Sequence, residues 1–463
     1  MSRRQRMTPI DLAWLRMDRP TNLMMIVGVH LYGGPVDLDR LEAQIAERLL
    51  RFRRFRQRIE QVGSGAYWCD DPNFDLSRHL HRVRLPGRGG KAALQRFVGE
   101  LASTPLDFAH PLWQIHFVEK YDGGVAAVLR FHHTIGDGDA LVRVSLTLGD
   151  DFQPAEMQED HREGGWPQSL LAPLIATVQT GAKASGFTLK RAFELIREPS
   201  KAIGYLKTSA EVAGELAYLL LMPPDSDTRF KGQPHGAKRV AWSEPLKLEE
   251  VKAVAHAVDC SVNDILLSCV AGAMRSFLED KGDDTDGVEV RAMVPINLRP
   301  PRPEIELGNH FGLLVLELPV GIKEPMPRLK EVRERMLALK NSVEPPVTLG
   351  LLAALGLSPK YVQDQVGDLI SSKCTAVMTN VPGPHKMMTV AGHPLKQSFF
   401  WVPQSGDIGC GVSILTYAGS VYFGLITDAA LVPDPEHVIS RFKPEFEKYL
   451  YLCLLEPATA AAQ

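Results

Sequence analysis

The sequence predicts an α/β protein with mixed sheets, divided into two domains. Its 463 residues exceed what one ordinary hydrophobic core organises, so two domains are the default expectation. Both halves combine short apolar segments typical of strands with longer segments whose apolar residues recur every three or four positions, as in helices. A polar stretch separates the halves. We expect an N-terminal domain at residues 1–165, a helical linker at 166–236 and a C-terminal domain at 237–463.

Composition narrows the class of protein. The net charge of −3 gives no case for nucleic-acid binding, and the six cysteines are scattered without a C-x-x-C pair, which favours a reducing, cytoplasmic compartment. The basic first residues are not followed by an apolar segment of signal-peptide length. The uncharged stretch from Ile408 to Thr427 alternates and contains glycines, so it predicts two strands joined at Ala418-Gly419-Ser420 rather than a membrane span.

Helical periodicity marks the first elements. Apolar residues recur every three or four positions from about Leu38 to Ile59 and predict an amphipathic helix. Its opposite face carries four arginines, which indicate a solvated surface more often than a site for lipid head groups or phosphate. These arginines are Arg48, Arg51, Arg54 and Arg58. A second helix is predicted from Lys91 to Ser103.

A β-hairpin is predicted next. Residues 111–118 predict a strand entered through a proline, and residues 125–132 a mostly buried second strand. The turn Tyr121-Asp122-Gly123-Gly124 joins them. This pairing places Trp113 in the same sheet as the two histidines that end the second strand, with core packing as its simplest role.

The sequence Phe131-His132-His133-Thr134-Ile135-Gly136-Asp137-Gly138 organises the interpretation of the whole chain. Side chains alternate across a strand, so His132 and His133 should point to opposite faces, and only one imidazole should meet a given substrate. Neutral imidazole accepts a proton near neutral pH, which makes His133 a candidate general base. Asp137 is expected to hold the following turn through an arginine or backbone N–H groups, and Gly138 to allow close backbone approach.

A structural role in the core and a metal site are the two alternatives to a general base. A single buried histidine is more often a hydrogen-bonded core residue than a catalyst. Adjacent histidines on one strand do not readily share one metal ion, and no further His, Cys or Glu cluster has ligand spacing, so no metal is expected. The sequence contains neither G-x-S-x-G nor a signature cysteine, so the nucleophile should come from a bound substrate.

A helix N-terminus in the second half is a candidate oxyanion site. Helix periodicity near residues 248–258 is followed by Ser261-Val262-Asn263-Asp264, in which Ser261 and Asp264 form a capping-box pattern. Asn263 then lies where backbone N–H groups and the helix dipole favour negative charge. It could stabilise an oxyanion, or it could be part of the helix cap and nothing more. Strands expected near residues 288–298, 313–320 and 374–381 adjoin turns that carry polar amides, which suit the lining of a pocket.

Together these stretches resemble the wax ester synthase/diacylglycerol acyltransferase family, from Asp11 to about Pro433. The motifs that carry the resemblance are Pro111-Leu112-Trp113, His132-His133-x-x-x-Asp137-Gly138, Val262-Asn263-Asp264-Ile265, Pro295-Ile296-Asn297-Leu298-Arg299-Pro300, Leu307-Gly308-Asn309 and Asn380-Val381-Pro382-Gly383-Pro384. The histidine motif alone indicates only the superfamily of chloramphenicol acetyltransferase and condensation domains. Thr379 in place of the usual serine and Asp139-Ala140 after Gly138 are small departures, and they leave acceptor choice more open than catalysis.

The resemblance implies two chloramphenicol acetyltransferase-like domains with a tunnel between them, and no cofactor beyond acyl-CoA as co-substrate. Long-chain acyl-CoA and diacylglycerol would meet at His133 and yield triacylglycerol without an acyl-enzyme, with Asn263 stabilising the oxyanion. The catalytic set is then His132, His133, Asp137, Gly138 and Asn263. The expected substrate-binding set is Trp113, Asp264, Asn297, Arg299, Asn309, Asn380, Pro382 and Gly383.

Two alternatives stay open from the sequence. A long-chain fatty alcohol could replace diacylglycerol, which would make the product a wax ester, because both acceptors bring a hydroxyl to the same base. A catalytically silent lipid-binding protein on the same scaffold is the alternative from another class. A lipid acceptor also implies work in the cytoplasm, peripherally at the inner membrane or at lipid bodies.

Overall fold

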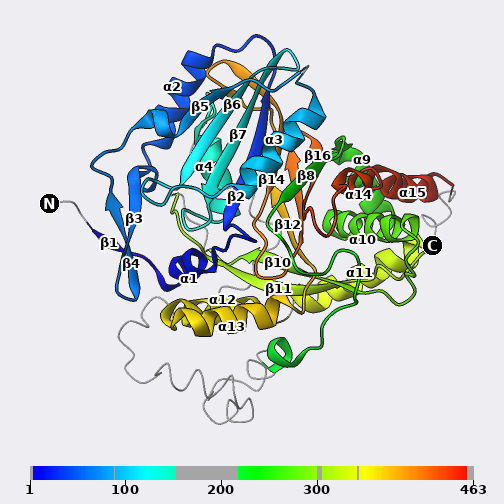
Figure 1. Cartoon of the computed structure of the whole chain (residues 1–463). Helices are drawn as coiled ribbons and strands as arrows, with labels where there is room; N and C mark the ends of the chain where they lie inside the picture. Colours follow the sequence, from blue (N-terminus) through cyan, green and yellow to red (C-terminus); the bar gives the residue numbers. More distant parts are fainter. Residues whose placement is uncertain are drawn as a thin grey trace.

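Two large mixed sheets with helices packed against them form the body of the molecule (Figure 1). The computed structural model describes residues 4–87, 89–152, 217–299, 305–340, 342 and 344–455. Both sheets combine parallel and antiparallel pairs, which confirms the prediction of a mixed α/β fold. Most of the helical linker expected at 166–236 lies outside the described residues.

The first large sheet has the strand order β13-β14-β2-β7-β6-β5. Its strands are β2 (Met25–Tyr32), β5 (Leu80–Val83), β6 (Trp113–Tyr121), β7 (Gly124–His132), β13 (Thr389–Val390) and β14 (His393–Trp401). The hairpin of β6 and β7 forms as predicted, with Tyr121 opposite Gly124 and Trp113 opposite Phe131. Every residue of β7 is buried, so this strand lies in the core and delivers the two histidines at its end.

The second half of the chain completes this first sheet. Strand β14 pairs antiparallel with β2, with Phe400 opposite Gly28 and Trp401 opposite Val27 (Figure 1). Residues 389–401 therefore belong to the sheet of the N-terminal half, although they lie inside the range 237–463 predicted for the other domain. The two halves are interleaved, a feature that no local sequence pattern indicates.

The second large sheet contains the order β11-β10-β12-β15-β16-β8, and β9 also pairs with β16. Its strands are β8 (Lys238–Trp242), β9 (Leu246–Lys247), β10 (Val290–Asn297), β11 (Phe311–Leu318), β12 (Ala376–Pro382), β15 (Cys410–Tyr417) and β16 (Ser420–Asp428). Strands β10, β12 and β15 run parallel, and β15 and β16 form the hairpin predicted for residues 408–427.

Helices cover the faces of both sheets (Figure 1). Their bounds are α1 (Pro9–Met17), α2 (Leu38–Leu49), α3 (Lys91–Ser103), α4 (Gly138–Thr147), α9 (Leu248–Ala257), α10 (Val262–Asp280), α11 (Pro325–Lys340), α12 (Glu344–Leu357), α13 (Lys360–Ser371), α14 (Pro435–Ile439) and α15 (Phe442–Leu455). Among the described residues, no single helix is long and apolar enough to cross a bilayer, and α9 and α10, bent by 98°, pass such a test only when taken together.

The predicted helix from Leu38 to Ile59 is wrong in its second half. Helix α2 ends at Leu49, a 3₁₀ turn spans Arg53–Arg56, and β3 (Gln57–Val62) begins directly after it. Strand β3 pairs with β4 (Gly65–Asp70), which in turn pairs with β1 (Gln5–Arg6) in a small third sheet. The side chain of Phe55 is fully buried against Phe131, and this tertiary packing overrides the local periodicity.

The arginine face predicted to be solvated is also only partly so. Arg54 is partly buried, its guanidinium lies 4.0 Å from the ring centroid of Trp68, and it faces the carboxylate of Asp11 at 4.0 Å. Arg48 donates a hydrogen bond to the carbonyl of Thr147 at the end of α4. These arginines bind other parts of the chain, which removes the ground for reading them as a lipid or phosphate site.

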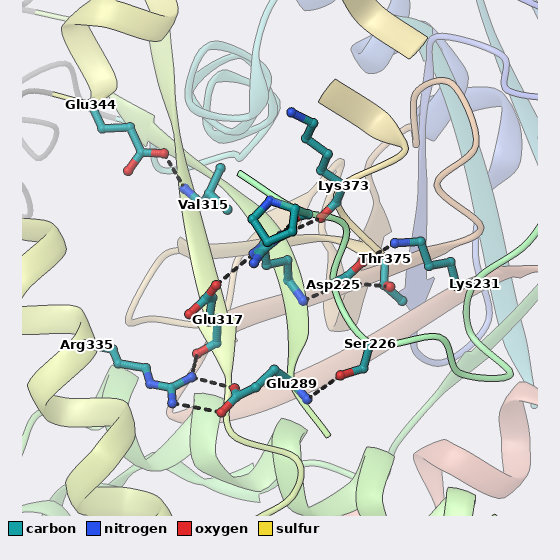
Figure 2. A network of polar contacts seen from close by, with 12 residues as sticks. Asp225, Ser226, Lys231, Glu289, Val315, Glu317, Arg335, Glu344, Lys373 and Thr375 are labelled. Atoms are coloured by element: carbon teal, nitrogen blue, oxygen red, sulfur yellow. Dashed lines mark hydrogen bonds and ion pairs between the residues drawn. The ribbon is translucent and has the colours of Figure 1, made fainter. Parts of the chain in front are cut away.

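A buried polar network holds residues 225–231 against the second large sheet (Figure 2). Asp225 pairs with Lys231 and accepts hydrogen bonds from the backbone of Arg291 at 2.9 Å and the hydroxyl of Thr375 at 2.7 Å. Arg291 also pairs with Glu317 on β11. The network connects residues 225–231 to β10 and β11 and supplies partners for the buried carboxylate of Asp225.

Candidate active site

The turn after β7 is held by the carboxylate of Asp137. One oxygen accepts the backbone N–H of Ala140 at 2.9 Å and so caps helix α4. The other accepts the backbone N–H of His310 at 2.9 Å and a guanidinium N–H of Arg299 at 3.1 Å. This geometry confirms the prediction that Asp137 would hold the turn through an arginine and backbone N–H groups, and both partners of the second oxygen come from the other half of the chain.

The backbone of residues 308–310 docks directly on this turn. Gly308 N–H donates to the carbonyl of Ile135 at 3.1 Å, and Asp137 N–H donates to the carbonyl of Gly308 at 3.3 Å, so that Gly136 and Gly308 form a short parallel bridge. Gly308 has a φ of 114°, a conformation that side chains with a Cβ rarely adopt. The same backbone position brings Asn309 against His133.

His133 is oriented by an amide and a carboxylate. Its Nδ1–H donates to Oδ1 of Asn309 at 2.9 Å. The Asn309 amide nitrogen in turn donates to Asp11 at 2.8 Å and to the carbonyl of His133 at 2.9 Å. Because Asn309 Oδ1 only accepts, the proton of the neutral ring sits on Nδ1. Nε2 keeps its lone pair, and no residue within the described ranges hydrogen bonds to it.

The surroundings of His133 favour its neutral form. Its ring stacks on Trp14 with centroids 4.5 Å apart and lies 5.7 Å from the ring of Phe311. Burial lowers the pKa of His133, and the nearby charge of Asp137 and the Asn309 hydrogen bond only partly oppose this. The residue as a whole is buried, with 6% of its surface exposed. Its neutral ring can accept a proton at neutral pH.

His132 has a separate set of partners, as expected for a residue on the opposite face of the strand. Its Nδ1 accepts the backbone N–H of Thr134 at 3.2 Å and also contacts the hydroxyl of Thr134 at 2.9 Å. Phe108 packs edge-on against the ring. Burial lowers the pKa of His132 to about 3, so the ring is neutral with its proton on Nε2. These contacts give His132 a role in shaping the turn.

Asn263 lies one residue inside α10, as predicted. Ser261 caps this helix, and its backbone N–H donates to one carboxylate oxygen of Asp264 at 2.9 Å, so that this oxygen completes the capping box. The Asn263 side-chain oxygen accepts from the amide of Asn380 at 3.0 Å. This leaves the Asn263 amide nitrogen as a donor without a partner in the described part of the chain. Asn380 thereby orients Asn263.

The other residues of the predicted substrate-binding set have different surroundings. Arg299 binds Asp137 and the carbonyl of Gly308, and Asn297 accepts the backbone N–H of Arg299 at 2.9 Å, so both hold the docked segment. Pro382 is exposed at the end of β12, whereas Gly383 is buried beside the cavity described next.

Trp113 is corrected from a substrate contact to a core residue. Its side chain is fully buried, stacks on His79 with centroids 4.4 Å apart and donates to the carbonyl of Phe55 at 2.8 Å. These partners leave no surface for a ligand.

A cavity begins beside the turn. Gly138 lines it at one end, where the nearest atom to a Cβ on this glycine would be a methyl of Val381 on β12, 3.9 Å away. Strands β2, β7 and β14 form one wall and helix α4 another, and residues from the ends of β12 and β15 also line it. The lining is largely apolar, which suits a lipid chain.

Two residues that contact the His133 site were not predicted from the sequence. Asp11 accepts both the side-chain and the backbone N–H of Asn309, and burial raises its pKa while the charge of Arg54 opposes that shift. Trp14 covers the His133 ring. Thr8-Pro9 is a helix start of recognisable form, and Thr8 does cap α1. Only the three-dimensional contact reveals what the buried face of that helix touches.

Comparisons with known structures define the class of fold. The chain is similar to the wax ester synthase/diacylglycerol acyltransferase of Marinobacter aquaeolei, with a TM-score of 0.67 at 19% identity, covering 97% of this chain and 100% of that one. It is also similar to the first condensation domain of the calcium-dependent antibiotic synthetase, with a TM-score of 0.59 at 14% identity, covering 97% and 96%. The architecture is therefore the two-domain fold of acyltransferases and condensation domains, as the sequence predicted.

Sequence comparison then gives the family. Residues 7–266 match the wax ester synthase/diacylglycerol acyltransferase catalytic domain, and residues 307–449 match the C-terminal domain of the same family. A protein of Mycobacterium tuberculosis named as a probable diacylglycerol O-acyltransferase is 26% identical over 451 residues, covering 92% of both chains. The chain belongs to the wax ester synthase/diacylglycerol acyltransferase family, and it is an acyltransferase.

The burial of His132 predicts a pH dependence of stability. The unfolded histidine binds a proton below about pH 6.5, whereas the folded one does so only near pH 3. Stability is therefore lost as the pH falls through that window, by about 2 kcal/mol at pH 5. We expect the His132→Asn variant, which keeps an acceptor near the position of Nδ1, to lose less stability between pH 7 and pH 5 in urea titrations. An unchanged pH slope in this variant would contradict the assignment.

Proposed function

We propose that the protein transfers a long-chain acyl group from acyl-CoA to the hydroxyl of diacylglycerol and so makes triacylglycerol. One observation carries this proposal: a buried, neutral His133 with a free Nε2 lone pair, in a chain of this family. The relatives' names support diacylglycerol as acceptor. Long-chain alcohols would use the same base, so a wax ester synthase activity is the second arm of the same assay.

The reaction needs only the proton chemistry of one imidazole. Nε2 of His133 removes the hydroxyl proton of the acceptor as the oxygen attacks the thioester carbonyl carbon. The tetrahedral intermediate collapses with cleavage of the carbon–sulfur bond, and the same Nε2–H returns the proton to the thiolate of CoA. An ester and free CoA leave, and no acyl group is attached to the protein at any stage.

The array Asp11–Asn309–His133 keeps the imidazole ready for both steps. The Asn309 oxygen fixes the proton on Nδ1, so the basic nitrogen is always Nε2. When Nε2 carries the transferred proton, the ring is charged, and the carboxylate of Asp137 and the hydrogen bond to Asn309 lower the cost of that charge in a buried place. Asn309 and Asp11 are positioning residues, because neither reaches the reacting atoms.

Asn263 is the proposed donor to the oxyanion. The negative oxygen of the tetrahedral intermediate needs a donor that does not have to reorient. Asn380 holds the Asn263 oxygen, so the amide nitrogen of Asn263 is directed away from that contact at the N-terminus of α10. The helix dipole adds a favourable potential there.

The acceptor lipid implies that the protein works in the cytoplasm, peripherally at the inner membrane or at a lipid-body surface. Two large side chains at the junction of α12 and α13 support this placement: Leu357 is 55% exposed and Tyr361 is 61% exposed. Exposed apolar side chains suit partial insertion at a lipid interface.

Loss of the base tests the proposal directly. We expect His133→Ala to lower triacylglycerol formation from palmitoyl-CoA and diacylglycerol by about 10²–10⁴-fold, because the attacking hydroxyl keeps its proton. Release of CoA thiol and formation of radiolabelled product are measured together, with hexadecanol as the parallel acceptor. His256→Ala, which removes an exposed histidine of α9, is the control. Near-wild-type turnover of a folded His133→Ala protein would remove His133 from the mechanism.

If Asn263 stabilises the oxyanion, replacing Asn263 should lower kcat more than replacing Asn380. Asn263→Ala should lower kcat by about 10²–10³-fold with KM for palmitoyl-CoA little changed, since the lost hydrogen bond forms only in the transition state. Asn380→Ala keeps the donor but frees its orientation, so a smaller loss, about tenfold, is expected. Equal and small effects on kcat in both variants would place the oxyanion elsewhere.

A further inference from the structure

We propose that the cavity beside Gly138 holds the long hydrocarbon chain of one substrate, and that Gly28 sets how far the chain enters. The inference rests on the proposed transfer reaction and specifies where one of its lipid chains lies. The cavity is distinct from the polar contacts that surround His133, which is not among the residues that line it.

The cavity is elongated along β2 and α4. Its wall on β2 runs from Ile26 to Tyr32, about 20 Å of strand, and helix α4 with its C-cap residue Leu148 covers it over about 15 Å. Ile26 pairs with Phe131, next to the histidine turn, whereas Tyr32 pairs with Leu395 at the opposite end of the sheet. One end thus adjoins the reactive turn, and the length suits a long chain and greatly exceeds an acetyl group.

Gly28 marks the middle of the cavity wall. It lies in β2, between β7 and β14, where a residue would ordinarily be covered, yet it remains partly exposed because it faces the open space. A Cβ at this position would meet only ordinary contacts, 3.5 Å from the carbonyl of Phe399 and 3.8 Å from a methyl of Leu129. A larger side chain would therefore fit the backbone and project into the cavity.

At the far end the Tyr417 hydroxyl is satisfied, and none of the residues that line the cavity is charged. The Tyr417 hydroxyl donates to the carbonyl of Leu395 at 2.7 Å and accepts the backbone N–H of Met388 at 2.9 Å. His30, the one histidine of the lining, is neutral because burial lowers its pKa to about 4. Such a wall offers nothing to a head group or phosphate and favours an alkyl chain.

The test changes the depth of the cavity at two places. Gly28→Leu fills the middle, and Met388→Ala enlarges the far end, where the Met388 side chain is half-buried. Gly367→Leu, on the open surface of α13 with no atom within 4 Å of its Cβ position, is the matched control. Transfer is measured with acyl-CoA thioesters of eight to twenty carbons on fixed diacylglycerol, and with alcohols of the same lengths on fixed palmitoyl-CoA.

We expect Gly28→Leu to lower the ratio of sixteen-carbon to eight-carbon turnover about tenfold in one of the two arms, and Met388→Ala to shift the same arm toward longer chains. The arm that responds identifies the source of the chain. Retained turnover with the eight-carbon substrate shows that the folded enzyme and its chemistry are intact.

A binding measurement separates the cavity from the reaction. Displacement of a fluorescent fatty acid by palmitate should be about tenfold weaker in Gly28→Leu than in wild type and Gly367→Leu. Weakened palmitate binding without any acyl transfer would uphold the cavity and refute the proposed function. Unchanged chain-length profiles in both arms, together with unchanged palmitate binding, would overturn the inference while leaving the proposed function in place.

Discussion

The site depends on the contact between the turn at residues 133–138 and the backbone of residues 308–310. Each segment belongs to a different half of the chain, and neither holds its conformation through its own contacts alone. Asp137 joins them with a side chain that caps α4 on one side and accepts from His310 and Arg299 on the other. A buried carboxylate is costly to leave without its donors, so the conformation of this turn depends on the contact between the two segments.

The contact between these two segments also determines which nitrogen of His133 carries the proton. Asn309 belongs to the docked segment 308–310. Its side-chain oxygen fixes the proton on Nδ1 of His133, and its amide nitrogen donates to Asp11, which holds the amide in place. Burial beneath Trp14 keeps the ring neutral, and neutrality is what a base that accepts a hydroxyl proton requires. The apolar cavity beside Gly138 begins next to the same turn, so the proposed base and the proposed binding site of the lipid chain adjoin each other.

Sequence patterns predicted what depends on neighbours along the chain. The β6–β7 hairpin, helix α3, the capping box of α10 and the cap that Asp137 makes on α4 all follow from local rules, whereas contacts between distant segments do not. Nothing in Thr8-Pro9-Ile10-Asp11 indicates that its carboxylate meets Asn309, nor in residues 389–401 that they complete the first sheet. The helix predicted to Ile59 was wrong because Phe55 keeps a helical spacing while serving the core of a sheet.

The protonation state of His133 tests this account most directly. In protein labelled with ¹⁵N at histidine, with the resonance assigned by its loss in His133→Gln, the ring at pH 7.5 should be neutral, with a protonated Nδ1 and an unprotonated Nε2. Replacing Asn309 by leucine should abolish this single tautomer, since the acceptor that fixes it is gone. A charged ring at pH 7.5, or a proton on Nε2 in the wild-type protein, would contradict the claim that the docked segment prepares the base.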